Sequence, residues 1–96
     1  LLIGKLKLSK NNYKVEYDNE NIELTKKEFE LLEYLMRNKN IVLSREKILD
    51  SVWGYDYFGD TNIIDVYIRY IRSKIDQKYN VNLIETVRGV GYIIRE

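Results

Sequence analysis

The spacing of hydrophobic and polar residues changes its period near residue 25. Before that point, "LLIGKLKL" and "YKVEY" alternate between apolar and polar positions, and "DNEN" is a turn signal that leads into "IEL". Alternation with a period of two is typical of β-strands that bury one face. Residues 1–24 therefore predict a small antiparallel sheet.

From residue 25 onward the apolar residues follow a helical period. Thr25 and Glu28 match a capping box, in which the threonine oxygen accepts a backbone N–H and the glutamate reaches back to the cap. One face of the helix that follows carries Phe29, Leu32, Leu35 and Met36. We expect this first helix to end near Asn38.

Two more helices are predicted beyond a short β-branched segment. "IVL" occupies 41–43, and Ser44 can cap a second helix that runs from Arg45 to about Val52. The segment "WGYDYFGDT" (53–61) contains two glycines and interrupts the helical period. A third helix is expected from Asn62 to Lys78.

The third helix has an unusual outer face. Four isoleucines form the narrow stripe that we expect it to bury: Ile64, Ile68, Ile71 and Ile75. The opposite face carries Asn62, Ile63, Val66, Arg69, Tyr70, Ser73 and Gln77, with Tyr67, Arg72 and Lys74 nearer its flanks. In the major groove of DNA an arginine can bond both acceptors of guanine, and a valine can contact the thymine methyl group. Alternatively, Val66 and Tyr70 pack against another domain or a second copy of the chain.

The segment "TVRGVGY" (86–92) predicts a closing hairpin with one arginine at its turn. Gly89 and Gly91 would allow the positive φ angles and close backbone approach of a turn against DNA. Helices, loop, outward-facing third helix and hairpin together predict an α+β winged helix-turn-helix with an N-terminal antiparallel sheet. In that fold the third helix enters the major groove, and Arg88 would meet the negative potential of the adjacent minor groove. The alternative is a plain hairpin turn with a solvated arginine.

Composition narrows the function classes. The 96 residues predict a single domain, 1–96, and the net charge of +1 does not by itself indicate nucleic-acid binding. The chain has no Cys and no His, which excludes a cysteine nucleophile, a Ser-His-Asp triad and a histidine-ligated zinc site built from this chain alone. It also lacks a dinucleotide fingerprint and a P-loop. We therefore expect no enzymatic activity, no cofactor and no metal.

No apolar run approaches the ~18 residues of a membrane span, which predicts a soluble, cytoplasmic protein.

Four segments, in order and spacing, resemble the signature segments of the OmpR/PhoB family of winged-helix response-regulator output domains: "LTKKEFELLEYL", "SREKILDSVWG", "IIDVYIRYIRSKI" and "ETVRGVGY". The resemblance covers nearly the whole chain, including the N-terminal strands. It implies a sequence-specific transcription factor domain that binds double-stranded DNA at tandem direct repeats, as a head-to-tail pair with a second copy of itself. It also implies an N-terminal receiver domain, phosphorylated by a sensor kinase. The receiver is absent from this sequence, and we expect Leu1 to follow the interdomain linker.

The resemblance also implies roles for individual residues. Base edges would be contacted by Val66, Arg69 and Tyr70, the phosphate backbone by Trp53, Tyr67 and Arg72, and DNA beside the wing by Thr86, Arg88 and Tyr92. Two positions depart from the family's pattern. Asn62 stands where many members have an arginine, although asparagine can still contact phosphate or adenine. Tyr67 stands where a histidine is frequent.

The loop between the second and third helices resembles the family's transactivation loop, which touches RNA polymerase in some members. Tyr55, Asp56, Tyr57 and Phe58 are candidates for that contact, or their aromatic rings fold back on the core. The alternative function for the whole chain is a winged helix that binds protein and not DNA. Salt distinguishes the two, because binding through several phosphate contacts weakens steeply with ionic strength.

Overall fold

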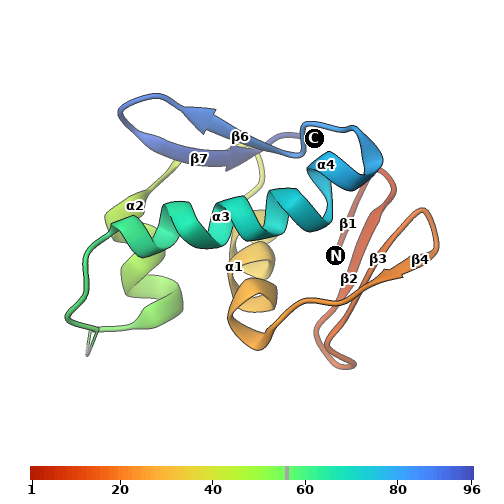
Figure 1. Cartoon of the computed structure of the whole chain (residues 1–96), viewed down its shortest axis with the longest axis horizontal. Helices are drawn as coiled ribbons and strands as arrows, with labels where there is room; N and C mark the ends of the chain where they lie inside the picture. Colours follow the sequence, from red (N-terminus) through yellow and green to blue (C-terminus); the bar gives the residue numbers. More distant parts are fainter. Residues whose placement is uncertain (56) are drawn as a thin grey trace.

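A computed structural model describes residues 1–55 and 57–96, in which two antiparallel sheets flank a set of helices (Figure 1). The strands of the first sheet are β1 (Leu2–Ile3), β2 (Leu6–Ser9), β3 (Lys14–Tyr17) and β4 (Glu20–Ile22). The helices are α1 (Lys26–Arg37), α2 (Arg45–Ile48), the π-helix η1 (Leu49–Trp53), α3 (Asn62–Lys74) and α4 (Asp76–Tyr79). The strands of the second sheet are β5 (Leu43–Ser44), β6 (Ile84–Val87) and β7 (Gly91–Ile94).

The first sheet confirms the predicted antiparallel sheet and corrects two of its strands. "LLIGKLKL" is divided by a turn at Gly4 (φ 55°) into β1 and β2, and β4 begins at Glu20, inside the predicted turn, and ends at Ile22. The order of the sheet is β1-β2-β3-β4, and each neighbouring pair is antiparallel. Alternate residues point into the core: Ile3, Leu6, Leu8, Val15 and Ile22. The turn between β3 and β4 has positive φ at Asp18 (50°) and Asn19 (68°), the pattern of a two-residue turn that suits the twist of a hairpin.

The capping box at the start of α1 is also confirmed. The backbone N–H of Glu28 donates to the Thr25 hydroxyl over 3.3 Å, and the backbone N–H of Thr25 donates to Glu28 Oε1 over 2.9 Å. These bonds satisfy two of the donors that every helix start leaves without a partner in the helix. The buried face of α1 holds Phe29, Leu31, Leu32, Leu35 and Met36.

The second helix has the predicted extent but a different hydrogen-bond pattern. The Ser44 hydroxyl accepts from Lys47 N over 3.1 Å and caps α2, as expected. After Ile48 the chain continues as the π-helix η1, and Gly54 N donates to Leu49 O. Apolar spacing cannot distinguish one widened turn from an α-helix. Gly54 ends the helix with a φ of 91°.

The third helix confirms the isoleucine stripe and corrects the predicted end. Ile64, Ile68, Ile71 and Ile75 are each at most 1% exposed. The helix does not continue to Lys78, because α3 ends at Lys74 and Ile75 departs from helical angles (φ −119°, ψ −67°) before the single turn of α4. This break directs Asp76 inward, where its Oδ2 accepts backbone N–H groups from Leu83 (3.0 Å) and Ile84 (3.1 Å). Ile63, expected on the outer face, is half-buried against the core.

The second sheet has the order β5-β7-β6 and forms the predicted wing (Figure 1). Gly89 at its turn has a φ of 75°, as expected. Gly91 was expected to need positive φ as well, but it lies in β7, and a Cβ there would be 1.9 Å from the carbonyl oxygen of Leu43 in β5. Close pairing of two backbones, not a turn, requires this glycine. The architecture is the predicted winged helix-turn-helix.

Across residues 1–55 and 57–96, no helix combines the length and the apolar character that crossing a membrane requires.

Candidate nucleic-acid interface

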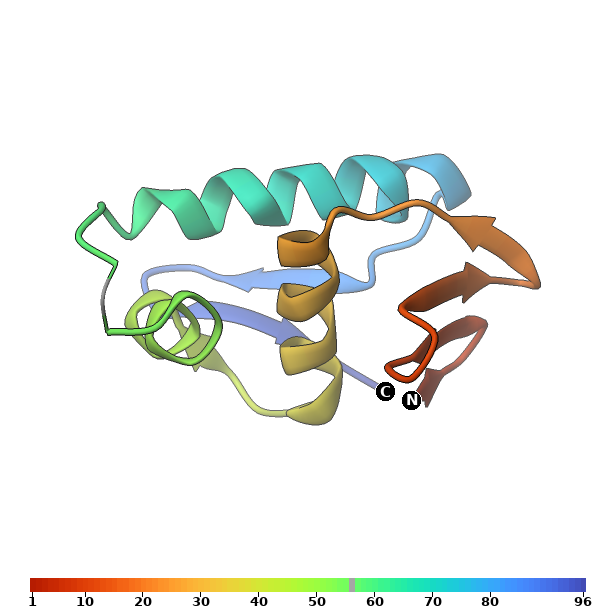
Figure 2. The same ribbon diagram turned by 90° about the horizontal axis from the view of Figure 1, so that it is seen from below.

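α3 lies along one side of the molecule and runs from the side of α2 to the side of the N-terminal sheet (Figure 2). Its isoleucine stripe faces inward, so the opposite side is turned to solvent. Arg69 and Tyr70 are exposed there and Val66 is half-buried. These three predicted base-reading residues stand at i, i+3 and i+4, which places them on one side of the helix. Asn62, at the first turn, is exposed as well.

An aromatic cluster connects the end of η1 to α3. The rings of Trp53 and Tyr67 meet edge to face with centroids 5.1 Å apart, and Tyr67 is 5.7 Å from Tyr70. The Lys27 ammonium lies 5.4 Å from the centroid of the Trp53 ring and donates to Val52 O over 3.2 Å. The structure thus brings three predicted site residues together, and adds a cation from α1 that the sequence did not indicate.

The wing presents Thr86 and Arg88 to solvent. Val90, on the other side of the turn, is 52% exposed. The strand register places Thr86 opposite Tyr92 and Val87 opposite Gly91, so residues 88–90 form the tip. Arg88 therefore occupies the turn, as predicted.

Tyr92 differs from the other predicted wing residues because it is only 4% exposed. Its hydroxyl donates to Asp65 Oδ1 on α3, and Arg45 Nε donates to the same oxygen over 2.8 Å. Burial, together with the bond to Asp65, raises the pKa of the Tyr92 hydroxyl above its ordinary value of 10. The bond to Asp65 also raises the pKa of Arg45, despite some burial. Tyr92 thus uses its polar atom inside the protein, where the resemblance implied a contact with DNA.

Arg72 is also engaged within the protein. Its Nε and Nη2 donate to the carbonyl oxygen of Ile84 over 3.2 and 2.8 Å, and Nη2 donates to Thr86 Oγ1 over 2.8 Å. These bonds join α3 to β6. The guanidinium predicted to bind phosphate is therefore held against the wing.

The loop after η1 exposes two aromatic side chains. Tyr55 is 89% and Phe58 97% exposed, so neither ring folds back on the core. Tyr57 is half-buried, and its hydroxyl end lies where a side chain at Gly59 would project. Asp56, the fourth residue predicted for the polymerase contact, lies outside the described residues.

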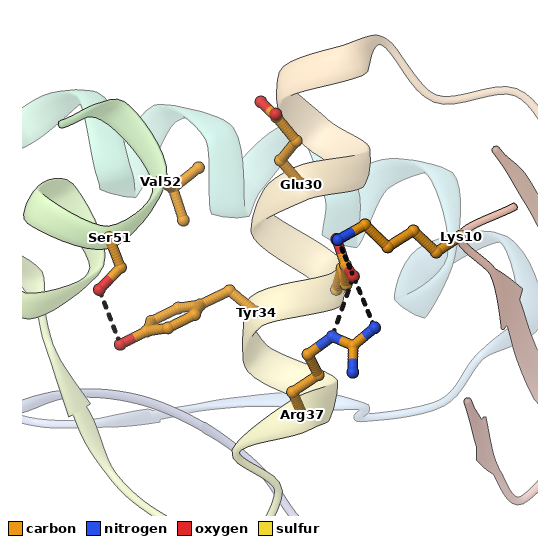
Figure 3. Close-up of a pocket in the computed structure, with 7 residues that line it drawn as sticks. Lys10, Glu30, Tyr34, Arg37, Ser51 and Val52 are labelled. Atoms are coloured by element: carbon orange, nitrogen blue, oxygen red, sulfur yellow. Dashed lines mark hydrogen bonds and ion pairs between the residues drawn. The ribbon is translucent and has the colours of Figure 1, made fainter.

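A groove of about 250 Å³ lies between α1, η1 and the end of β2 (Figure 3). Apart from Glu30, whose Oε1 lies 3.2 Å from the Lys27 ammonium outside the lining, its polar groups are engaged with one another. The Ser51 hydroxyl donates to Tyr34 Oη over 3.0 Å, and Glu33 pairs with Arg37 (2.9 Å) and Lys10 (3.7 Å). None of the predicted site residues that the structure describes lines this groove, so it does not form part of the candidate interface.

Comparison with protein families agrees with the geometry of α3 and the wing. Residues 19–94 match the family described as "Transcriptional regulatory protein, C terminal". The chain belongs to this family. It covers the C-terminal DNA-binding domain of response regulators of the OmpR/PhoB type, and the family is one of transcription regulators and not a class of enzymes.

Individual relatives place this OmpR/PhoB-type domain within longer proteins. It is 51% identical over 95 residues to the uncharacterized transcriptional regulatory protein YkoG of Bacillus subtilis, covering 99% of the chain but 42% of YkoG. The response regulator DrrB of Thermotoga maritima, described as an OmpR/PhoB homolog, matches with a TM-score of 0.88 and 32% identity, over 100% of this chain and 44% of DrrB. The DNA-binding domain of Klebsiella pneumoniae RstA, solved in complex with the RstA box, matches with a TM-score of 0.87 and 27% identity, over 99% and 95% of the two chains.

Sequence reasoning missed the partners that hold the OmpR/PhoB-type wing against α3. Arg45 and Asp65 had no predicted role, although Arg45 carried a signal. A cation in the first turn of a helix opposes the helix dipole, which favours acidic residues there. An arginine at that position suggests a carboxylate from another element, and the structure supplies Asp65.

Proposed function

We propose that this domain binds double-stranded DNA in a sequence-specific manner and regulates transcription as the output domain of a two-component response regulator. α3 occupies the major groove, and the β6–β7 wing lies over the adjacent minor groove. The observation that carries the proposal is the outward side of α3, where Val66, Arg69 and Tyr70 stand together beside a wing with Arg88 at its tip.

Base reading is assigned to the three residues on that side. Arg69 can donate to both major-groove acceptors of a guanine, Val66 can contact a thymine methyl group, and Tyr70 can donate through its hydroxyl. Asn62 at the start of α3, with Trp53 and Tyr67 of the aromatic cluster, contacts the phosphate backbone. Arg88 enters the minor groove, where a narrow A·T-rich groove concentrates negative potential.

For Arg72 and Tyr92 we propose a role different from the DNA contact that the resemblance implied. Thr86 faces solvent and contacts phosphate, while Arg72 and Tyr92 support it and the wing from behind. The RstA DNA-binding domain, which was solved with its DNA box and shares this fold, supports the general mode of docking.

The remaining parts of the function concern assembly. The chain spans 42% of the length of YkoG and of the response regulator ArlR of Staphylococcus aureus. We place an N-terminal receiver, phosphorylated by a sensor kinase in the cytoplasm, in the rest of the protein. Two copies bind tandem direct repeats head to tail. Tyr55, Tyr57 and Phe58 contact RNA polymerase, a role supported by the exposure of two of these aromatic rings.

Selection of bound sequences from a random duplex pool tests this function. The expected result is two half-sites in the same orientation, about 10 base pairs apart from centre to centre. Affinity for the selected duplex should fall steeply as salt increases, because phosphate contacts release counterions. A pool without enrichment, or binding of a protein partner with little salt dependence, would favour the alternative of a protein-interaction winged helix.

A further inference from the structure

Tyr92 of β7 lies where the second helix, the third helix and the wing meet. Two guanidinium groups lie over its ring, with Cζ of Arg45 5.3 Å and Cζ of Arg72 5.6 Å from the ring centroid. The first belongs to α2 and the second to α3. A cation over an aromatic face is attracted by the ring electrons, and more strongly where water is excluded. The buried ring of Tyr92 is therefore held electrostatically from both helices.

The Tyr92 hydroxyl adds a directional contact. It shares Asp65 Oδ1 with Arg45 Nε, so one carboxylate oxygen joins α3, β7 and α2. Hydrogen bonds made with ionised groups are the stronger ones and require alignment.

The wing needs such a contact to keep its direction. Ile84 and Ile94 are buried at the end of the hairpin away from the tip, and burial of apolar surface stabilises contact without fixing an angle. Toward the tip, β5 pairs only with Tyr92 and Gly91, and residues 88–90 extend beyond it. A two-stranded hairpin alone is marginally stable in water, so the bonds near its tip decide where Arg88 stands.

We infer that Tyr92 is a positioning residue for DNA binding: through Asp65, Arg45 and Arg72 it sets the angle between the wing and α3. It thereby fixes the separation of the α3 side chains from Arg88. Two side chains that must reach adjacent grooves of one duplex contribute fully only when this separation is preset, because ordering them on binding costs free energy. This inference rests on the proposed function for its consequence, but the angle itself can be measured without DNA.

The first measurement uses the absence of cysteine from the chain. Cysteines introduced at Val90 on the wing tip and Ser73 on α3, both exposed, accept spin labels. Pulsed electron paramagnetic resonance then reports the distribution of distances between wing and helix. Tyr92→Phe removes only the hydroxyl, and we expect it to broaden and shift this distribution. Tyr34→Phe removes a hydroxyl that bonds Ser51 in the groove on α1, and should leave the distribution unchanged.

The second measurement is a double-mutant cycle on the selected duplex with an A·T-rich flank. Arg88→Ala should weaken binding ~10-fold in the wild-type background and less than ~3-fold in the Tyr92→Phe background, since residues in one network couple non-additively. In the Tyr34→Phe background, Arg88→Ala should weaken binding as much as in the wild type. Thermal unfolding of each variant tests whether the variant is folded, so that a change in DNA affinity can be assigned to the position of the wing. If Tyr92→Phe does not fold, Asp65→Asn takes its place.

The outcomes separate the inference from the function on which it rests. A distance distribution that is identical in wild type and Tyr92→Phe overturns the inference, whatever the DNA measurements show. If Arg88→Ala weakens binding in the wild type, a loss of equal size in the Tyr92→Phe background overturns the inference as well. A broadened distribution with no effect of Arg88→Ala in the wild type supports the positioning role of Tyr92, and instead contradicts the proposed minor-groove contact of the wing.

Discussion

Replacement of Glu28 by alanine is expected to lower the free energy of unfolding by about 2–4 kcal/mol. Glu28 is 3% exposed and its Oε1 accepts both the Thr25 backbone N–H (2.9 Å) and the Lys74 ammonium (2.6 Å). It therefore connects the start of α1 to the end of α3. Loss of a helix cap costs about 1 kcal/mol, and loss of a hydrogen bond between ionised groups about 1.5–3 kcal/mol. The side chain of Lys74 is 37% exposed, so its ammonium recovers part of its hydration and the lower half of the range is favoured.

Urea unfolding, followed through the single tryptophan, Trp53, measures this loss. In thermal unfolding, where each kcal/mol lowers the midpoint of a domain of this size by about 4–8 °C, the same change corresponds to a midpoint lower by roughly 8–30 °C. Glu85→Ala is the matched control, because Glu85 pairs with Arg95 at the surface over 3.3 Å and such pairs contribute about 0–1 kcal/mol. The reasoning is refuted if Glu28→Ala costs no more than Glu85→Ala.

The pH dependence of the same site provides an independent check with Glu28→Gln. Burial raises the pKa of Glu28, but the bonds from Lys74 and Thr25 outweigh it and hold the pKa below its ordinary value of 4.5. A carboxyl group with a lowered pKa in the folded state stabilises the fold above its unfolded pKa, and this stabilisation is lost as pH falls through the folded pKa. The stability difference between wild type and Glu28→Gln should therefore be full near neutral pH and shrink below about pH 4.5. A difference that is constant from neutral to acidic pH would argue against an ionised Glu28.

Three further predictions concern DNA contacts and a second buried carboxyl group. Arg69→Ala should cost ~1–3 kcal/mol of specific affinity and blur discrimination at one base position, measured by titration of single-base variants of the selected duplex. An equal loss on random duplexes would contradict base reading. Arg88→Ala should weaken binding most where the flank is A·T-rich, and equal losses with A·T and G·C flanks would exclude the minor-groove assignment. For Asp76, burial raises the pKa above its ordinary 3.8, so the folded state binds a proton more tightly than the unfolded state. Wild type should therefore gain stability relative to Asp76→Asn as pH falls from neutral toward 3.8, the ordinary pKa of an aspartate, and the opposite trend in urea unfolding would show that Asp76 is not held in this environment.

Most elements of the fold could be predicted because their signals are local. The capping residues Thr25 and Glu28 are three positions apart, and the isoleucine stripe of α3 repeats within one helix. That stripe also set the outward side of α3, and the glycines of "TVRGVGY" located the turn of the wing. Each of these patterns depends on neighbours within about four residues, which a sequence displays directly.

The missed features depend on contacts between residues of different elements. The break at Ile75 serves the bonds of Asp76 to Leu83 and Ile84, which follow α4 in the chain. Gly91 is needed because β5 passes within reach of its Cα, 47 residues from Ser44 in sequence but paired with it in the sheet. Neither the break at Ile75 nor the need for a glycine facing β5 is marked in the sequence by a hydrophobic period or a motif.

The sequence by itself determined that the isoleucine face of α3 is buried, and therefore that Val66, Arg69 and Tyr70 lie on the opposite side. Only the tertiary structure decided that Tyr92 and Arg72 turn inward and that Arg45 and Asp65 join them. The physical reason is that burial follows from composition along one element, whereas a hydrogen bond requires two particular atoms from separate elements to meet within about 3 Å.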